Sequence, residues 1–204
     1  QLLLSLDPTH VEARKRLVAH LQEQGHEQMS LVQLSQLAEQ ASAQGLWAEA
    51  LQAWQHLYDC QQNPLALERL GYLCQQLGRP SEAQHHYQKL LDYFEQQQRT
   101  LDAVSICDRL IELQPEALEL QHRQIGLLVQ LGWKERLQDR QFTLALAYQQ
   151  RHQMGNALCL LHSVLDLNPH HEASLHKVVD IQLACGSHPE AVASGELVVE
   201  ALLT

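Results

Sequence analysis

Apolar residues recur at steps of three and four along almost the whole chain. One such stripe comprises Leu31, Leu34, Leu37, Ala38 and Ala41. A spacing of i, i+3 and i+4 places these side chains on one face of an α-helix. No stretch alternates apolar and polar residues in the way that a half-buried strand does. The pattern therefore predicts a wholly helical chain.

Prolines and single glycines divide this helical pattern into segments. Pro8, Pro64, Pro115 and Pro169 recur at intervals of about 54 residues, and a proline cannot continue the interior of a helix. Between the prolines, apolar stretches end in glycine, the residue that most often caps a helix at its carboxyl end. These glycines are Gly25, Gly45, Gly78, Gly132 and Gly186, and Gln98 and His152 occupy the matching places without a glycine.

The repeating unit predicted by these marks has three helices. The expected helices span residues 10–24, 27–44, 46–61, 65–77, 81–97, 100–113, 116–131, 134–151, 154–167, 171–185 and 189–203. They group into units over about 8–63, 64–114, 115–168 and 169–204. No Gly/Ser-rich linker interrupts them, so we expect a single continuous solenoid over 1–204.

Several copies of the pattern resemble the tetratricopeptide repeat (TPR). The clearest copy consists of Leu67, Leu70, Gly71, Gly78, Ala83, Tyr87 and Leu90. Small residues at Gly71 and Ala83 let helix axes approach, and Tyr87 fills the space beside them. The resemblance implies an all-α fold, an α-α superhelix of about 11 antiparallel helices. In a regular array the turns recur every 34 residues, whereas here the steps between turns alternate between about 20 and about 34 residues. The middle helix of each unit therefore fits the motif twice, once as a second helix and once as the first helix of an overlapping copy.

Composition excludes some classes of partner. The 204 residues carry a net charge of −10, which disfavours nucleic acid and anionic lipid, since both attract clustered Lys and Arg. No apolar stretch is long enough to span a bilayer. The five cysteines include no CxxC pair, a set that suits buried structural thiols in a reducing compartment. We therefore expect a cytoplasmic location, with export as the open alternative because the chain starts with Gln1. A bacterial source is a separate expectation.

Candidate chemistry is weak. Thirteen histidines suggest metal binding, but the densest clusters, His85-His86 and His170-His171, lack the i, i+4 spacing of a helical zinc pair. We expect solvated or helix-capping histidines and no metal or cofactor. Cys159 and His162 are three residues apart on one predicted helix, yet nothing nearby supplies an orienting group or an oxyanion hole. Cys159 is expected to pack in an apolar stripe, and the chain is expected not to be an enzyme.

The resemblance also implies a recognition surface, because the first helices of regular TPR arrays line a concave groove. The matching positions here are Glu68, Tyr72, Gln75, Gln76, Phe142, Leu146, Gln149, His176, Asp180 and Leu183. Glutamine amides can donate to and accept from a peptide backbone. In the alternative interpretation, the glutamines only solvate a helical surface, and Phe142 and Leu146 belong to the core.

Three functional hypotheses remain open at the level of sequence. The first is a non-enzymatic scaffold that binds a protein or peptide, neutral or basic in charge, or further copies of itself. The second is a regulatory or targeting arm of a larger multidomain protein. Two observations motivate it: the chain starts with Gln1, and residues 2–8 resemble the end of the predicted helix at residues 164–169. Both are expected of a segment of a longer protein. The third, a metal-responsive module, rests on the histidines alone.

Overall fold

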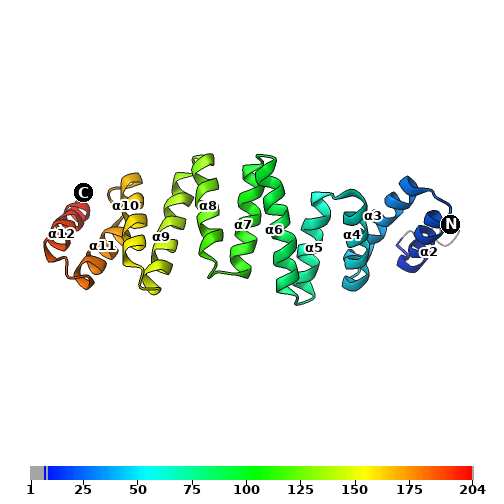
Figure 1. Cartoon of the computed structure of the whole chain (residues 1–204), viewed down its shortest axis with the longest axis horizontal. Coiled ribbons are helices and arrows are strands. Elements are labelled where there is room, and N and C mark those ends of the chain that lie inside the picture. The colour runs from blue at the N-terminus through cyan, green and yellow to red at the C-terminus, as the bar shows by residue number, and fades with distance from the viewer. Residues whose placement is uncertain (1–6, 8, 204) are drawn as a thin grey trace. The chain divides into compact units, whose positions relative to one another are not determined.

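The computed structural model describes residue 7 and residues 9–203, and every regular element in these residues is an α-helix (Figure 1). The helices are α2 (Val11–Glu23), α3 (Glu27–Ala43), α4 (Trp47–Gln61), α5 (Pro64–Gln76), α6 (Pro80–Gln96), α7 (Thr100–Leu113), α8 (Leu118–Leu131), α9 (Lys134–Gln150), α10 (Met154–Leu167), α11 (Glu172–Ala184) and α12 (His188–Leu203). The predicted all-α class is confirmed, and each predicted helix lies within about two residues of an observed one. The predicted pattern at residues 2–6 and Pro8 lies outside the described residues.

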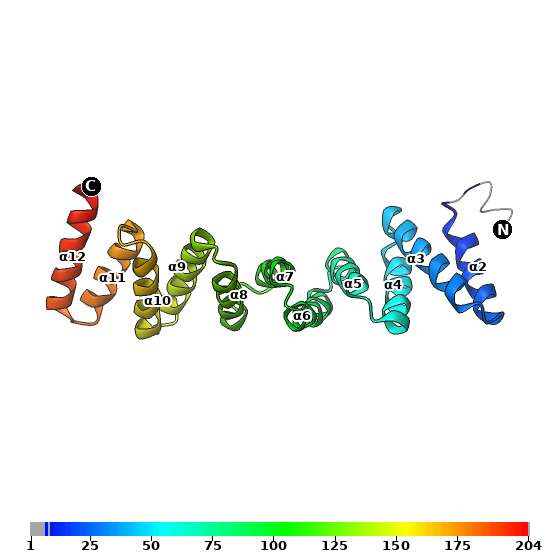
Figure 2. The same cartoon turned by 90° about the horizontal axis from the view of Figure 1, so that it is seen from above.

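The chain divides into two compact units, residues 1–106 and residues 107–204. The division falls inside α7 and coincides with none of the predicted unit boundaries. In the first unit α2, α3, α4, α5 and α6 pack in sequence, each on the next, and in the second α8 to α12 do the same. Figure 2 shows this succession from a second direction. The single solenoid over 1–204 stays a prediction.

Local side-chain chemistry starts several of these helices. The Asn63 side chain accepts a hydrogen bond from the Leu65 N–H at 2.9 Å, and Pro64 occupies the first turn of α5, where its missing N–H costs nothing. His10 and His171 act in the same way: their Nδ1 atoms accept from the N–H groups of Ala13 and Ser174. Helix capping by histidine is therefore present at two of the thirteen positions.

The helices end where the turn marks predict. Each of the five glycines has a positive φ between 68° and 77°, and Gln98 and His152 take the same left-handed conformation at 55° and 59°. The two non-glycine residues therefore stand at equivalent turns, as their spacing predicts. A side chain at such a position is strained, because its Cβ approaches the following carbonyl oxygen.

The core of the first unit runs between α2 and α5. Its largest members include Trp54, Leu57 and Leu70, each at most 4% exposed. On α5, Gly71 allows α6 to approach, because a Cβ built there would lie 2.5 Å from Cε1 of the fully buried Tyr87. The close-packing role predicted for Gly71 and Tyr87 is thus confirmed by their contact.

The second unit has a smaller apolar core and buries more amide groups. Ala145, Ala157, Leu161, Val178 and Ile181 form one of its apolar clusters. Gln124, Gln141 and Gln182 are at most 8% exposed, and their Oε1 atoms have no hydrogen-bond partner within the described part of the chain. Burying a polar atom without a partner costs free energy, and buried amides distinguish this unit from the first.

Candidate functional site

A groove between α2 and α4 is the first candidate binding site. We call it the α2–α4 groove; its lining consists of Val11, Lys15, Val18, Ala19, Gln22, Leu34, Leu37, Glu49, Gln52, Ala53 and His56. Helices α2 and α4 form its walls and α3 its floor, and its volume is about 200 Å³. All five polar lining residues are exposed around an apolar floor. This is the usual composition of a site for a ligand with an apolar anchor.

An adjoining hollow shares two residues with the α2–α4 groove. Gln22 Nε2 and His56 Nε2 approach to 3.5 Å across it. The same two residues line an adjoining hollow of about 470 Å³ with Glu27, Leu31 and Cys60. The two hollows therefore lie next to each other and share Gln22 and His56 in their linings.

A buried arginine fixes the wall of this groove. Arg14 on α2 is 6% exposed, and its Nε donates to Gln40 Oε1 at 2.8 Å. Its Nη1 donates to Gln33 Oε1 at 2.6 Å and also to Gln36 Oε1. These bonds from one guanidinium to three side chains of α3 hold α2 in register, since hydrogen bonds to charged groups are the stronger ones. No motif in the sequence pointed to Arg14.

A second hollow lies between α3 and α5. We call it the aromatic pocket; its lining consists of Glu39, Ser42, Trp47, Trp54, Arg69, Tyr72 and Leu73, and its volume is about 240 Å³. Trp54 is 4% exposed and forms the base, with its Nε1 donating to Ser42 Oγ at 3.4 Å. Tyr72 is 43% exposed and stands at the rim.

The two hollows open on opposite faces of the first unit. A helix turns about 100° per residue, so Trp47 and Trp54 share one side of α4, whereas Gln52 and His56 lie about half a turn away. Successive antiparallel helices thus present alternate faces: α2 and α4 border the groove, and α3 and α5 border the aromatic pocket.

One of the four predicted surface residues on α5 lines a hollow. Tyr72 lies in the aromatic pocket. Gln75 is half-buried and accepts a hydrogen bond from the Tyr87 hydroxyl at 3.0 Å, which gives it a structural role. Glu68 is half-buried and Gln76 is exposed, and neither lines a described hollow.

The predicted residues of the second unit lie on α9 and α11. Phe142 is half-buried against the apolar cluster, and its ring meets the His171 ring edge-on at 5.5 Å between centroids. This contact brings the middle of α9 to the start of α11. Leu146 and Gln149 are half-buried as well, while His176, Asp180 and Leu183 are exposed on α11. Asp180 pairs with Lys177 at 3.5 Å. These positions stay a prediction as a binding surface.

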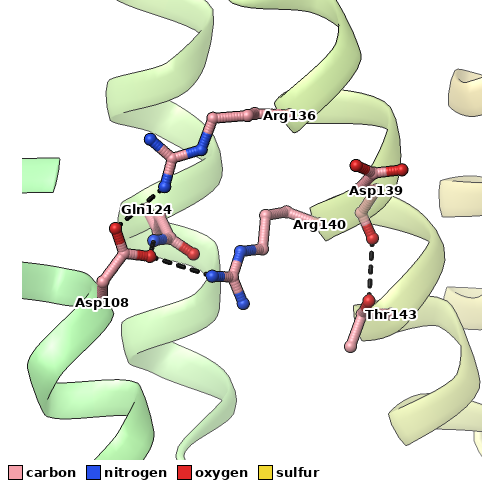
Figure 3. Close-up of polar contacts among 6 residues, drawn as sticks. All are labelled: Asp108, Gln124, Arg136, Asp139, Arg140 and Thr143. Atoms are coloured by element: carbon pink, nitrogen blue, oxygen red, sulfur yellow. Dashed lines mark hydrogen bonds and ion pairs between the residues drawn. The ribbon is translucent and has the colours of Figure 1, made fainter. Parts of the chain in front are cut away.

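A polar cluster joins α7, α8 and α9 in the second unit (Figure 3). Asp108 accepts hydrogen bonds from Gln124 at 2.6 Å, Arg136 at 2.8 Å and Arg140 at 2.9 Å. The guanidinium of Arg136 also lies 5.3 Å from the centroid of the Trp133 ring. Both oxygens of the carboxylate are bonded to side chains of α8 and α9, so the cluster links three helices.

The cysteines differ from their expected burial. Cys74 and Cys107 are buried, but Cys60, Cys159 and Cys185 are exposed. The expectation that Cys159 packs in an apolar stripe is wrong: at its place on α10 the packed side is occupied by Ala157 and Leu161. Burial, followed by the nearby Glu82 carboxylate, raises the pKa of the Cys74 thiol above its ordinary value, so this thiol is a poor nucleophile.

Few titratable groups are shifted in a way that suggests chemistry. Burial, reinforced by His85 and Lys89, lowers the pKa of His86. Among the described residues, no three side chains of His, Cys, Asp and Glu come close enough to hold a metal ion. Nor does any described helix combine the length and the apolar character needed to cross a membrane.

Antiparallel helix pairs, positive-φ turns between them and the Gly71–Tyr87 contact define an all-α helical repeat. Neither a protein-family model nor a curated protein matches the chain.

Solved structures of similar architecture do exist. A putative kinesin light chain from Podosopora anserina, described as having nearly identical TPR-like repeats, is 19% identical, covers 96% of each chain and gives a TM-score of 0.48. MamA AMB-1 is 16% identical over 85% of this chain and 92% of its own, with a TM-score of 0.48. BtubC (BKLC) from P. vanneervenii is 14% identical over 95% and 89%, with a TM-score of 0.46. At these identities the likeness is one of helical architecture alone.

Proposed function

We propose that this chain is a non-enzymatic scaffold that binds a protein or peptide partner in the α2–α4 groove. The observation that carries the proposal is the apolar floor of this groove, formed by Val18, Leu34, Leu37 and Ala53 beneath a polar rim. The hydrophobic effect favours uptake of apolar side chains by a hollow with an apolar floor between two helices.

The chemistry of the rim supports a peptide as the occupant. Gln22 and Gln52 present amides that both donate and accept, and therefore suit a peptide backbone. Lys15 and Glu49 give the two walls opposite charges. The net charge of −10 favours approach of a neutral or basic partner over an acidic one.

The test uses the full chain and a displayed library of random twelve-residue peptides. Peptides selected on the wild-type chain are measured against Ala19→Arg, which fills the groove from an exposed position on α2. The matched control is Ala48→Arg, at an exposed position on α4 outside the lining. We expect Ala19→Arg to weaken binding by at least about tenfold and Ala48→Arg to leave it unchanged.

Thermal unfolding of both variants establishes that each one is folded. The proposal fails if the library yields no peptide that binds, or if the selected peptides bind Ala19→Arg and Ala48→Arg equally well.

A further inference from the structure

Aromatic residues are concentrated in the aromatic pocket. The chain is only 5% aromatic, yet two of its three tryptophans and one tyrosine line this one small hollow. Trp47 and Trp54 come from α4, and Tyr72 comes from α5. Tryptophan and tyrosine are the residues that most often dominate the binding energy of protein interfaces, because they bury a large area with few rotatable bonds.

The size of the pocket restricts its occupant. Its volume of about 240 Å³ is below the roughly 300–1,000 Å³ of sites that enclose a whole small molecule. A single large side chain of a partner fits this space, with the rest of the partner lying outside on α3 and α5.

The two charged residues of the pocket stand on opposite walls. Glu39 projects from α3 and Arg69 from α5, and both are exposed. Within the part of the chain that the structure describes, neither forms an ion pair with another side chain. The rim therefore has a defined polarity across its width, negative at α3 and positive at α5.

We propose that the aromatic pocket anchors one aromatic side chain of a partner protein. On one side of this side chain the partner carries a basic residue that contacts Glu39, and on the other side an acidic residue that contacts Arg69. The aromatic walls match the central side chain, and the opposed charges fix the direction in which the partner crosses from α3 to α5. Complementary charges at the rim of an interface set orientation and specificity more than affinity.

This inference rests on the proposed function in that the partner is a protein, but it concerns a separate site. The aromatic pocket shares no lining residue with the α2–α4 groove and opens on the other side of α4. The first unit can thus bind on two faces at once.

The probes are acetylated and amidated nine-residue peptides with Gly-Ser flanks. Their centres read Lys-Phe-Glu, Glu-Phe-Lys, Lys-Phe-Lys and Glu-Phe-Glu, with Ala replacing Phe in a matched set. The protein is the full chain carrying Trp133→Phe, so that Trp47 and Trp54 are the only sources of tryptophan emission. A saturable change in this emission reports binding close to α4, and the variants below assign that binding to the pocket or to the groove.

We expect one of the two mixed-charge orders to bind at least about tenfold tighter than the Glu-Phe-Glu probe and the Ala-centred probes. The double variant Glu39→Lys/Arg69→Glu should reverse the preference between the two mixed orders. Tyr72→Ala should weaken binding by about tenfold or more. Its matched control is Leu65→Ala, because Leu65 is on the same helix and 44% exposed, against 43% for Tyr72; it should bind as the wild type does.

Ala19→Arg separates this site from the groove, and we expect it to leave probe binding unchanged. The inference is overturned if no probe gives a saturable change or if Tyr72→Ala binds as tightly as Leu65→Ala. It is also overturned if Lys-Phe-Lys binds tightest to both the wild-type and the charge-swapped chain, since net charge alone then explains binding. Loss of binding in Ala19→Arg with full binding in Tyr72→Ala would support the groove and reject the pocket.

Discussion

Gln98 and His152 hold a backbone conformation that glycine adopts at the five equivalent turns. Their φ values of 55° and 59° are left-handed, and both side chains are exposed. For a residue with a Cβ this conformation costs roughly 1–2 kcal/mol. Their spacing from the neighbouring glycines identified both positions from the sequence, because turn geometry depends on a few adjacent residues.

Replacing Gln98 or His152 with glycine should therefore stabilise the chain. We expect Gln98→Gly and His152→Gly each to raise the free energy of unfolding by about 0.5–1 kcal/mol, since relief of strain exceeds the added entropy of the unfolded chain. Urea denaturation measures the change. Gln96→Gly, two residues earlier at the last position of α6, should instead destabilise by up to roughly 0.5–1 kcal/mol. Equal destabilisation by all three substitutions would contradict the assignment of strain.

At the scale of helices, contacts between neighbours decide which small residues matter. Gly71 and Gly126 both lie inside helices. A Cβ at Gly71 would lie 2.5 Å from the Tyr87 ring, whereas a Cβ at Gly126 would meet nothing within 4 Å. The sequence motif predicted the role of Gly71 through its resemblance to TPR repeats, but it gave no means of ranking the two glycines.

Gly71→Ala and Gly126→Ala should have opposite effects on stability. We expect Gly71→Ala to lower the free energy of unfolding by about 1–3 kcal/mol, because the buried Tyr87 ring must shift. Gly126→Ala should raise it by roughly 0.5–1 kcal/mol, since alanine favours the helix. Adding Tyr87→Leu should cost less in the Gly71→Ala background than in the wild type. Additive costs in this double-mutant cycle would show that α5 and α6 do not meet at this point.

Across the whole molecule, the cysteines report which helix faces are buried and which are exposed in each of the two units. Cys74 and Cys107 are buried, one in each unit, while Cys60, Cys159 and Cys185 are exposed. The sequence predicts that these thiols are buried, because a cysteine between apolar residues has the same local sequence whether it is buried or exposed.

Titration with an aromatic disulfide reagent should show three fast thiols in the folded chain and all five in urea. The two slow thiols are Cys74 and Cys107; burial excludes the reagent, and at Cys74 it also raises the thiol pKa and so lowers the thiolate fraction. Cys60→Ser should remove one fast thiol, whereas Cys74→Ser should leave the fast count unchanged. Five fast thiols in the folded wild type would contradict the packing of α5 and α7.

The sequence by itself determined the helical class, the ends of the helices and the left-handed turns. These features depend on apolar periodicity and on capping residues within a few positions of each other. It also singled out Tyr72, which proves to line a hollow.

Only the tertiary structure decided the two hollows of the first unit to which we assign binding. Glu39, Trp54 and Arg69 come from three helices, and their meeting depends on how those helices rotate against each other, which no local pattern encodes. The one available signal was the presence of two tryptophans seven residues apart on α4 in a chain poor in aromatic residues. The two hollows open on opposite faces because alternate helices border the same face. Helices α2 and α4 border the α2–α4 groove, and α3 and α5 border the aromatic pocket.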